Sequence, residues 1–158
     1  MSKLTGLIVS AAVAVAALSV TAKAAEQVVI VDGDTLKLDG TTYRLWGVDT
    51  PEKGQQCERE GEYYDCGLYA QFALQAFIGD GDVRCEKVNT DRYRRVVAKC
   101  FVGNTDLGSW MVFNGFALEY KRYSKGYYTF EQDEAEKAER GVWAGDFTLP
   151  WVWRKERR

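Results

Sequence analysis

The chain has 158 residues, no histidine, and 21 basic against 23 acidic side chains, which gives a formal net charge of −2. This balance argues against a protein that coats nucleic acid through bulk positive charge. Without histidine, acid–base chemistry falls to carboxylates, Lys, Tyr, Cys or metal-bound water. A local phosphate site stays compatible with this charge, because basic residues gather at Arg92–Arg95, Lys121–Lys125 and Arg154–Arg158.

The first 24 residues predict a secretory signal peptide. Met1–Lys3 is positively charged, Leu7–Val20 is apolar, and Ala22-Lys23-Ala24 fits a small-x-small cleavage site. The apolar run is short for a membrane-spanning helix, which needs about 20 residues, and a retained anchor is the alternative. Residues 25–158 then have the length of a single domain, exported to the periplasm or out of the cell, with a net charge of −4 because the signal carries two lysines and no acids.

Three strands are predicted next. Gln27–Val31 is rich in β-branched residues, and Thr35–Leu38 and Thr41–Val48 flank Asp39-Gly40, a strong hairpin turn signal. Asp32-Gly33-Asp34 separates the first two strands and places carboxylates near an arginine of the third. Carboxylates suit a hard metal ion and an arginine suits a phosphate, so this hairpin is the leading candidate for a functional site.

The register of this hairpin decides which side chains meet. A two-residue turn would pair Leu38 with Thr41 and direct Arg44 away from Asp34. A three-residue turn, with Gly40 in the left-handed conformation, or an equivalent bulge, would pair Asp34 with Arg44. We predict the second register because it lets the two groups share one site.

The remainder of the chain predicts one helix, two strands and two further helices. Three strands, a helix and two more strands suit a small five-stranded barrel of the OB type with about three helices, and a helix-on-sheet α+β domain is the alternative. The predicted segments are a loop at Asp49–Asp65, a helix at Gly67–Ile78, strands at Val83–Val88 and Arg95–Val102, a helix at Asp106–Phe113, an extended piece at Phe116–Tyr120, and a helix at Tyr127–Arg140. The Trp-rich tail is expected to pack back on the domain.

Four cysteines, at positions 57, 66, 85 and 100, follow the signal. An oxidising compartment and an even count favour two disulfides. Zinc is the alternative, although no Cys-x-x-Cys spacing and no histidine support it. Cys57–Cys66 would close a local loop, and Cys85 and Cys100 face one another if the predicted hairpin is centred so that Val88 faces Val97.

Three motifs that are weak singly become specific together. They are Val31-Asp-Gly-Asp-Thr35, Tyr43-Arg-Leu-Trp-Gly-Val-Asp-Thr-Pro-Glu52 and Thr90-Asp-Arg-Tyr-Arg-Arg95. In this order and spacing the chain resembles the staphylococcal nuclease (thermonuclease) family, over nearly all of Val28–Ala144. The resemblance implies an OB-fold barrel and a Ca²⁺-dependent phosphodiesterase that acts on DNA and RNA and leaves 3′-phosphates.

The resemblance also implies roles for individual residues. Asp34 and Asp49 match the carboxylates that bind calcium, and Thr50 matches the residue that offers it a backbone carbonyl. Arg44 and Arg95 match the two arginines that bind phosphate. Because three protein oxygens cannot saturate Ca²⁺, which takes 6–8 ligands, open positions would remain for water and substrate.

Glu52 matches the carboxylate usually assigned as the general base. Tyr93 matches a tyrosine near the bound nucleotide, Tyr123 a second one, and Lys121 stands where the family often has another. One departure concerns the turn motif, whose usual glycine is Arg94 here. If that position needs a positive φ angle, Arg94 is strained and the arginine that follows it changes direction, or else Arg94 adds a phosphate contact.

The implied function is therefore a monomeric, exported nuclease. The main alternative is a non-catalytic OB module that binds an oligonucleotide or a protein, as OB barrels often do. Inactive relatives tend to lose the Asp, Arg and Glu residues, which this chain keeps. A secreted structural domain with only surface charges is the remaining alternative.

Overall fold

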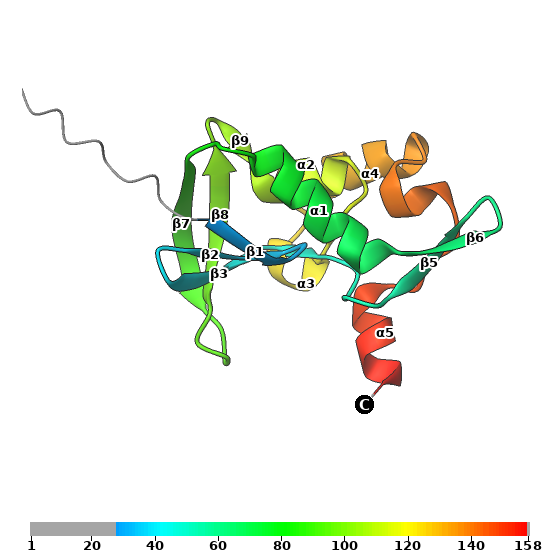
Figure 1. The fold of residues 1–158 in the computed structure, drawn as a ribbon, viewed down its shortest axis with the longest axis horizontal. Coiled ribbons are helices and arrows are strands. Elements are labelled where there is room, and N and C mark those ends of the chain that lie inside the picture. The colour runs from blue at the N-terminus through cyan, green and yellow to red at the C-terminus, as the bar shows by residue number, and fades with distance from the viewer. Residues whose placement is uncertain (1–27, 158) are drawn as a thin grey trace, which may run out of the picture.

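A computed structural model describes residues 28–157, which form a mixed α+β fold (Figure 1). The signal peptide predicted for residues 1–24 lies outside these residues. The strands are β1 (Val28–Asp32), β2 (Thr35–Leu38), β3 (Thr41–Leu45), β4 (Val48–Asp49), β5 (Gln56–Arg59), β6 (Glu62–Asp65), β7 (Val83–Thr90), β8 (Val96–Val102), β9 (Thr105–Asp106) and β10 (Leu118–Glu119). The helices are α1 (Cys66–Ile78), α2 (Leu107–Phe113), α3 (Lys121–Ser124), α4 (Thr129–Lys137), the 3-10 helix η1 (Gly141–Ala144) and α5 (Pro150–Glu156).

The main sheet has the strand order β1-β2-β3-β8-β7, and β9 pairs with β8. Neighbouring strands are antiparallel except β3 and β8, which run parallel. β4 pairs with β10, and β5 with β6. In Figure 1, α1, α2 and α4 lie above β1–β3, whereas the tip of the β7–β8 hairpin and α5 both project below. The lower side of the sheet is therefore flanked by these two projections.

The core fills the space between the sheet and the helices above it. Leu36, Leu45 and Ala98 of the sheet are buried with Leu74 of α1 and Met111 of α2. Inward positions recur every second residue in β8 and every fourth residue in α1, as the two periodicities require. Among residues 28–157, no helix combines the length and apolarity that crossing a bilayer demands.

The predicted helices are present as α1, α2 and α4, but α3 and α5 were not expected. α5 starts at Pro150, whose fixed φ and missing N–H suit the first turn of a helix. The expectation that the tail packs back is confirmed, because Trp151 stacks on Tyr120 with 5.3 Å between ring centroids. The count of about three helices was too low because α3, with four residues, is too short for a periodic pattern, and because α5 lies in the Trp-rich tail, for which only packing was predicted.

The prediction of an unbroken loop over Asp49–Asp65 is wrong. This stretch contains the β5–β6 hairpin, which turns at Glu60 and Gly61 with φ angles of 53° and 84°. Its strands of four residues carry charged and aromatic side chains in place of the alternating apolar residues of a typical strand. The hairpin projects beyond the end of α1 (Figure 1).

The predicted register of the β2–β3 hairpin is also wrong. Leu38 pairs with Thr41, so the turn has two residues, and Asp39 and Gly40 take φ angles of 49° and 78°. Positive φ at both positions is the type I′ geometry, whose twist matches that of the flanking strands. Arg44 consequently pairs with Thr35 in the ladder.

Both predicted disulfides are present, Cys57–Cys66 and Cys85–Cys100. Cys85 and Cys100 are direct partners across β7 and β8, as predicted. An irregularity between Lys87 and Asn89 shifts the ladder beyond them, so that Asn89 takes the place expected for Val88. Because no cysteine is free, the zinc alternative is excluded.

Candidate functional site

Arg44, on β3, binds two carboxylates from different parts of the chain. Its Nη1 donates to Asp34 Oδ1 at 2.5 Å, and its Nη2 donates to Asp49 Oδ1 at 2.8 Å. Asp34 lies in the turn between β1 and β2, and Asp49 ends β4. The two aspartates are 3% and 0% exposed. One guanidinium thus holds two buried acids together.

Arg44 reaches Asp34 despite the two-residue turn because Asp34 does not lie within a strand. The β1–β2 ladder is irregular between Ile30 and Asp32, and the N–H of Asp34 donates to Asp32 Oδ1 at 3.1 Å. In such a turn the alternation of faces along a strand no longer fixes the side-chain direction. Asp34 and Arg44 are therefore in contact, as predicted, although the register of the β2–β3 hairpin differs from the predicted one.

Burial dominates the titration of these acids. It raises the pKa of Asp34 to about 6, against the opposing charge of Arg44 and with a further contribution from the nearby Asp32. Burial also raises the pKa of Asp49, although hydrogen bonds and charges from arginines oppose it. For Arg44, burial acts to lower the pKa, but the two aspartates outweigh it and raise the pKa. Burial therefore disfavours the ionised forms of both acids by more than their arginine partners favour them.

A second arginine, which no sequence motif singled out, completes this cluster. Arg154 of α5 donates from Nη1 to Asp49 Oδ1 at 3.0 Å and to Glu52 Oε1 at 2.6 Å, and from Nη2 to Asp49 Oδ2 at 2.7 Å. Burial acts to lower its pKa, but bonds to both acids raise the pKa overall. The sequence offered one indication of this arginine, the basic tail that follows Pro150 and the tryptophans. A tail that packs back on the domain brings its basic side chains close to the domain.

The backbone of Glu52 is held from two sides. Its N–H donates to Gln55 Oε1 at 3.1 Å, and the fully buried Gln55 donates from Nε2 to the carbonyl of Thr148 at 2.6 Å. On the other side, Gly67 of α1 lies so close that an added Cβ would overlap the Glu52 carbonyl. The Cys57–Cys66 disulfide joins β5 to the start of α1. Sequence-distant segments therefore fix the position of Glu52.

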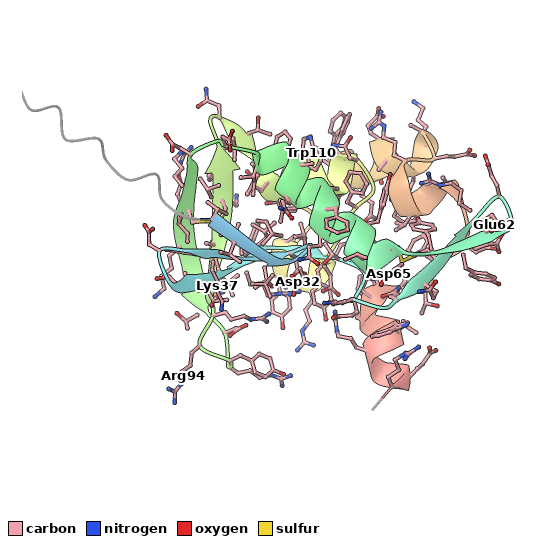
Figure 2. The ribbon with its side chains drawn as sticks, viewed as in Figure 1. Asp32, Lys37, Glu62, Asp65, Arg94 and Trp110 are labelled. Atoms are coloured by element: carbon pink, nitrogen blue, oxygen red, sulfur yellow. A yellow bond between two sulfur atoms is a disulfide. The ribbon has the colours of Figure 1, made fainter. Side chains whose placement is uncertain are left out.

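Arg95 lies at the tip of the β7–β8 hairpin and has a local partner. Its Nε donates to Asp91 Oδ2 at 2.8 Å, and its backbone N–H donates to Asp91 Oδ1 at 3.0 Å. Arg94 has a φ of 67°, so the residue in the usual glycine position does adopt the left-handed conformation. Its side chain points away from the body of the molecule (Figure 2). Among residues 28–157, Arg95 forms its salt bridge with Asp91 and none with the acids around Arg44.

The hairpin tip nevertheless leaves the sheet beside Arg44. Val96, the residue after Arg95, pairs with Tyr43 of β3, and Val97 pairs with Arg44. Because β3 and β8 are adjacent and parallel, Arg44 and Arg95, the residue just before β8, lie at neighbouring positions along the two strands. The structure thus separates the two arginines into different hydrogen-bond networks while keeping their backbones close.

The three residues predicted to contact substrate lie on the surface. Tyr93 is 62% and Tyr123 is 54% exposed. The Tyr123 ring packs edge-on against Tyr120 at 5.1 Å, and the exposed Lys121 lines a hollow of about 480 Å³ with Tyr120 and Trp151. In the described part of the chain, none of the three is hydrogen-bonded to the acids around Arg44.

Oxygen atoms supply the donors that a cation could use here. Within residues 28–157 no three His, Cys, Asp or Glu side chains converge in the manner of a closed metal site. The buried carboxylates of Asp34 and Asp49 lie together on Arg44, and the N–H of Thr50 donates to Asp34 Oδ2 at 3.4 Å, which places Thr50 beside them. Carboxylate and carbonyl oxygens are the hard donors that Ca²⁺ takes, and so few protein donors would leave most of its positions to water.

Comparison with known proteins identifies relatives. The family model described as staphylococcal nuclease homologue matches residues 42–145. The succinoglycan biosynthesis protein ExoI of Rhizobium meliloti is 35% identical over 74% of this chain and 63% of its own length. An uncharacterized endonuclease of Haemophilus influenzae is 29% identical over 82% of this chain and 71% of its own length.

A probable staphylococcal-like nuclease of rice, CAN4, is 32% identical over 73% of this chain. The chain spans only 22% of the rice protein, as against 63% of the Rhizobium protein, so the relatives share a domain and not a common length. The family match covers β4, β8 and all of β3 but its first residue, with Arg44, Asp49 and Glu52, whereas Asp34 precedes it. The chain therefore belongs to the staphylococcal nuclease homologue family.

Proposed function

We propose that this protein is an exported, Ca²⁺-dependent phosphodiesterase that hydrolyses DNA and RNA and leaves 3′-phosphates. The observation that carries the proposal is the single network joining Asp34, Arg44, Asp49 and Glu52 through charged hydrogen bonds. Relatives named endonucleases support the reaction class. The strand order β1-β2-β3-β8-β7, with one parallel pair, supports a five-stranded OB barrel as its scaffold.

Asp34, Asp49 and the carbonyl of Thr50 would hold the Ca²⁺ ion. Both carboxylates are buried and both have raised pKa values, so a cation beside them would favour the ionised forms that burial disfavours. When bound, the ion would neutralise part of the charge on the scissile phosphate. The remaining chemistry falls to the side chains of the protein.

Arg44 and Arg95 would bind the phosphate oxygens. A guanidinium offers a planar fork that matches phosphate, and an arginine aimed at charge developing on phosphorus supplies about 2.7–4 kcal/mol, the scale of an oxyanion-hole donor. Arg44 is 20% exposed and Arg95 27% exposed, so each keeps part of its guanidinium open to a ligand. For Arg95 to reach the same phosphate, it would exchange its bond to Asp91 for one to substrate.

Glu52 would act as the general base that takes the proton of the attacking water. Its side chain is 36% exposed, so water reaches it, while Arg154 orients one of its oxygens. Tyr93, Lys121 and Tyr123 would contact the nucleotide, because exposed aromatic rings and a cation suit bases and phosphates of a single strand. A monomer suffices, since every proposed group comes from one chain.

The test is digestion of denatured DNA and RNA by the mature protein, with Ca²⁺ or with a chelator. Cleavage should require Ca²⁺, and phosphatase-dependent end-labelling should detect 3′-phosphates on the products. Glu52→Gln and Arg44→Ala should each lower the rate by orders of magnitude while the variants stay folded. Failure of a folded, Ca²⁺-loaded protein to cleave would refute the proposal, and an oligonucleotide-induced rise in Tm without cleavage would indicate a binding module.

A further inference from the structure

Arg154 lies outside both the family match and the sequence motifs. The family model ends at residue 145, whereas α5 spans Pro150–Glu156. Yet the guanidinium of Arg154 contacts both Asp49 and Glu52, with three hydrogen bonds between 2.6 and 3.0 Å. A helix outside the family match thus supplies a group to the centre of the proposed active site.

Two anchors fix the helix that carries Arg154. Trp151, one turn earlier, stacks on Tyr120 with an interplanar angle of 8°. Just before α5, the carbonyl of Thr148 accepts a hydrogen bond from Gln55, and the same Gln55 side chain accepts from the N–H of Glu52. The segment that leads into α5 and the loop that carries Glu52 are therefore tied together through one buried amide.

Arg154 bridges the two acids in a way that favours one geometry. A single nitrogen, Nη1, donates to Asp49 Oδ1 and Glu52 Oε1, while Nη2 donates to Asp49 Oδ2. The bidentate fork on the fully buried Asp49 fixes the guanidinium plane, because planar forks are rigid. Within residues 28–157, Arg154 provides the only salt bridge of Glu52. The direction of the Glu52 carboxylate therefore depends on Arg154.

We propose that Arg154 is a positioning residue that fixes the Glu52 carboxylate against Asp49 for phosphodiester hydrolysis. This role rests on the proposed function of Glu52 as general base. It acts through Glu52 and not through the phosphate, so its loss lowers the turnover number and leaves substrate binding intact. Its loss also removes a positive charge from Asp49, so Ca²⁺ affinity stays the same or increases.

The first experiment compares Arg154→Met, Arg154→Lys and Arg157→Ala. Arg157 is the matched control, because it directly follows α5. Its guanidinium carbon lies 4.2 Å from the centre of the Trp153 ring and, within residues 28–157, makes no bond to the acids. We expect Arg154→Met to lower kcat about 10- to 100-fold, the scale of a misplaced catalytic group, with KM changed less than about twofold. Lys keeps the charge without the fork, so Arg154→Lys should recover part of kcat. Arg157→Ala should match the wild type.

The second experiment asks whether Arg154 acts through Glu52. In an Glu52→Gln background, Arg154→Met should lower kcat no further, because the group that it positions is already lost. Calorimetric titration with Ca²⁺ should give an equal or tighter Kd for Arg154→Met. Three results would each overturn the positioning role. The first is a double variant in which the kcat losses of Arg154→Met and Glu52→Gln multiply. The others are a raised KM with unchanged kcat in Arg154→Met and loss of Ca²⁺ binding in that variant.

A stability cycle tests the pairing without turnover. Melting temperatures of the metal-free wild type, Arg154→Met, Glu52→Gln and the double variant should be non-additive, because the two side chains share a bond. Additive shifts would overturn the role of Arg154 even in an active enzyme. An inactive wild type with non-additive shifts would refute the nuclease function and the base role of Glu52, and with them the catalytic meaning of this pairing.

Discussion

The Arg44 cluster and the tip of the β7–β8 hairpin each pair an arginine with an aspartate, yet the acids respond in opposite ways. At Asp34 and Asp49 burial prevails and the pKa values rise. At Asp91 burial also acts to raise the pKa, but hydrogen bonds from Arg95 and from the backbone prevail, and the pKa falls. The same kind of ion pair therefore fails to offset burial in the cluster and does offset it at the tip.

The source of the partners explains this difference. Arg44 binds acids from other turns and strands, and Arg154 arrives from α5 at the end of the chain. Asp91 is satisfied by its own turn, through the side chain of Arg95 and two backbone N–H groups. The cluster is therefore built from tertiary contacts, whereas the acid at the tip is satisfied by groups of its own turn.

The largest expected effect separates the two arginines. Arg44→Ala and Arg95→Ala should each lower kcat by about 10²- to 10³-fold on single-stranded DNA, if both bind the phosphate. Only Arg44→Ala should also destabilise the fold, by about 3 kcal/mol, because it leaves the buried Asp34 carboxylate without a charged partner, whereas Asp49 keeps Arg154. Urea unfolding measures the second quantity, with Arg95→Ala as the control at less than about 1 kcal/mol. Equal losses of stability would contradict the contrast between cluster and tip.

A pH effect should follow from Asp34. Its pKa is raised from 3.8 to about 6, so the folded protein holds this proton more tightly than the unfolded chain does. The metal-free protein therefore loses stability from Asp34 as the pH rises from about 4 to about 6, on the order of 3 kcal/mol in total. The proposed Ca²⁺ ion would bind the ionised form, so the rise in Tm on adding Ca²⁺ should grow across the same window. Asp34→Asn should remove the part of this pH dependence that comes from Asp34 and leave the part that comes from Asp49, whose pKa is also raised; an unchanged pH dependence would contradict the role of Asp34.

The disulfides offer a smaller and more local contrast. Their loops of 9 and 15 residues predict losses of about 2.5 and 3 kcal/mol when each pair is replaced by serines. Cys66 adjoins Gly67, which packs on the Glu52 carbonyl, so losing Cys57–Cys66 should also lower kcat. The Cys85–Cys100 variant should keep its kcat when assayed well below its Tm. Unchanged kcat in the first variant would show that its bridge does not support the Glu52 loop.

The smallest effect concerns Arg94. Its φ of 67° costs a non-glycine residue about 1–2 kcal/mol. Arg94→Gly should therefore stabilise the protein by about 1 kcal/mol in thermal or urea unfolding, after the greater freedom of glycine in the unfolded chain is subtracted. The exposed side chain makes no contact that the variant would lose at the cluster, so kcat should change little. A marked fall in kcat would instead assign Arg94 a contact with the substrate.

Local patterns predicted the regions where partners are close in sequence. The pairing of Cys85 with Cys100 followed from the hairpin, and α1 followed from its apolar spacing. The register around Gly40 failed because it was inferred from the need to bring Asp34 to Arg44. The chain meets that need with an irregular turn at Asp34, whose side-chain direction no alternation rule predicts.

Arg154 could not be found by spacing, since 105 residues separate it from Asp49 and 102 from Glu52. Its position depends on the stacking of Trp151 and the bond between Gln55 and Thr148, which are tertiary contacts. The predicted loop over Asp49–Asp65 failed for a related reason. The β5–β6 hairpin lacks an alternating apolar face and is held by its turn and its disulfide.

The ion-pair cluster has a kinetic consequence. Asp34, Asp49 and Glu52 share only two guanidiniums, Arg44 and Arg154, so the cluster carries one net negative charge. An approaching nucleic-acid strand is repelled by that charge until a cation reverses its sign. In the proposed nuclease, binding would therefore be ordered, with the cation before the strand. The concentration of divalent cation would then set how fast substrate associates, in addition to how fast it is cut.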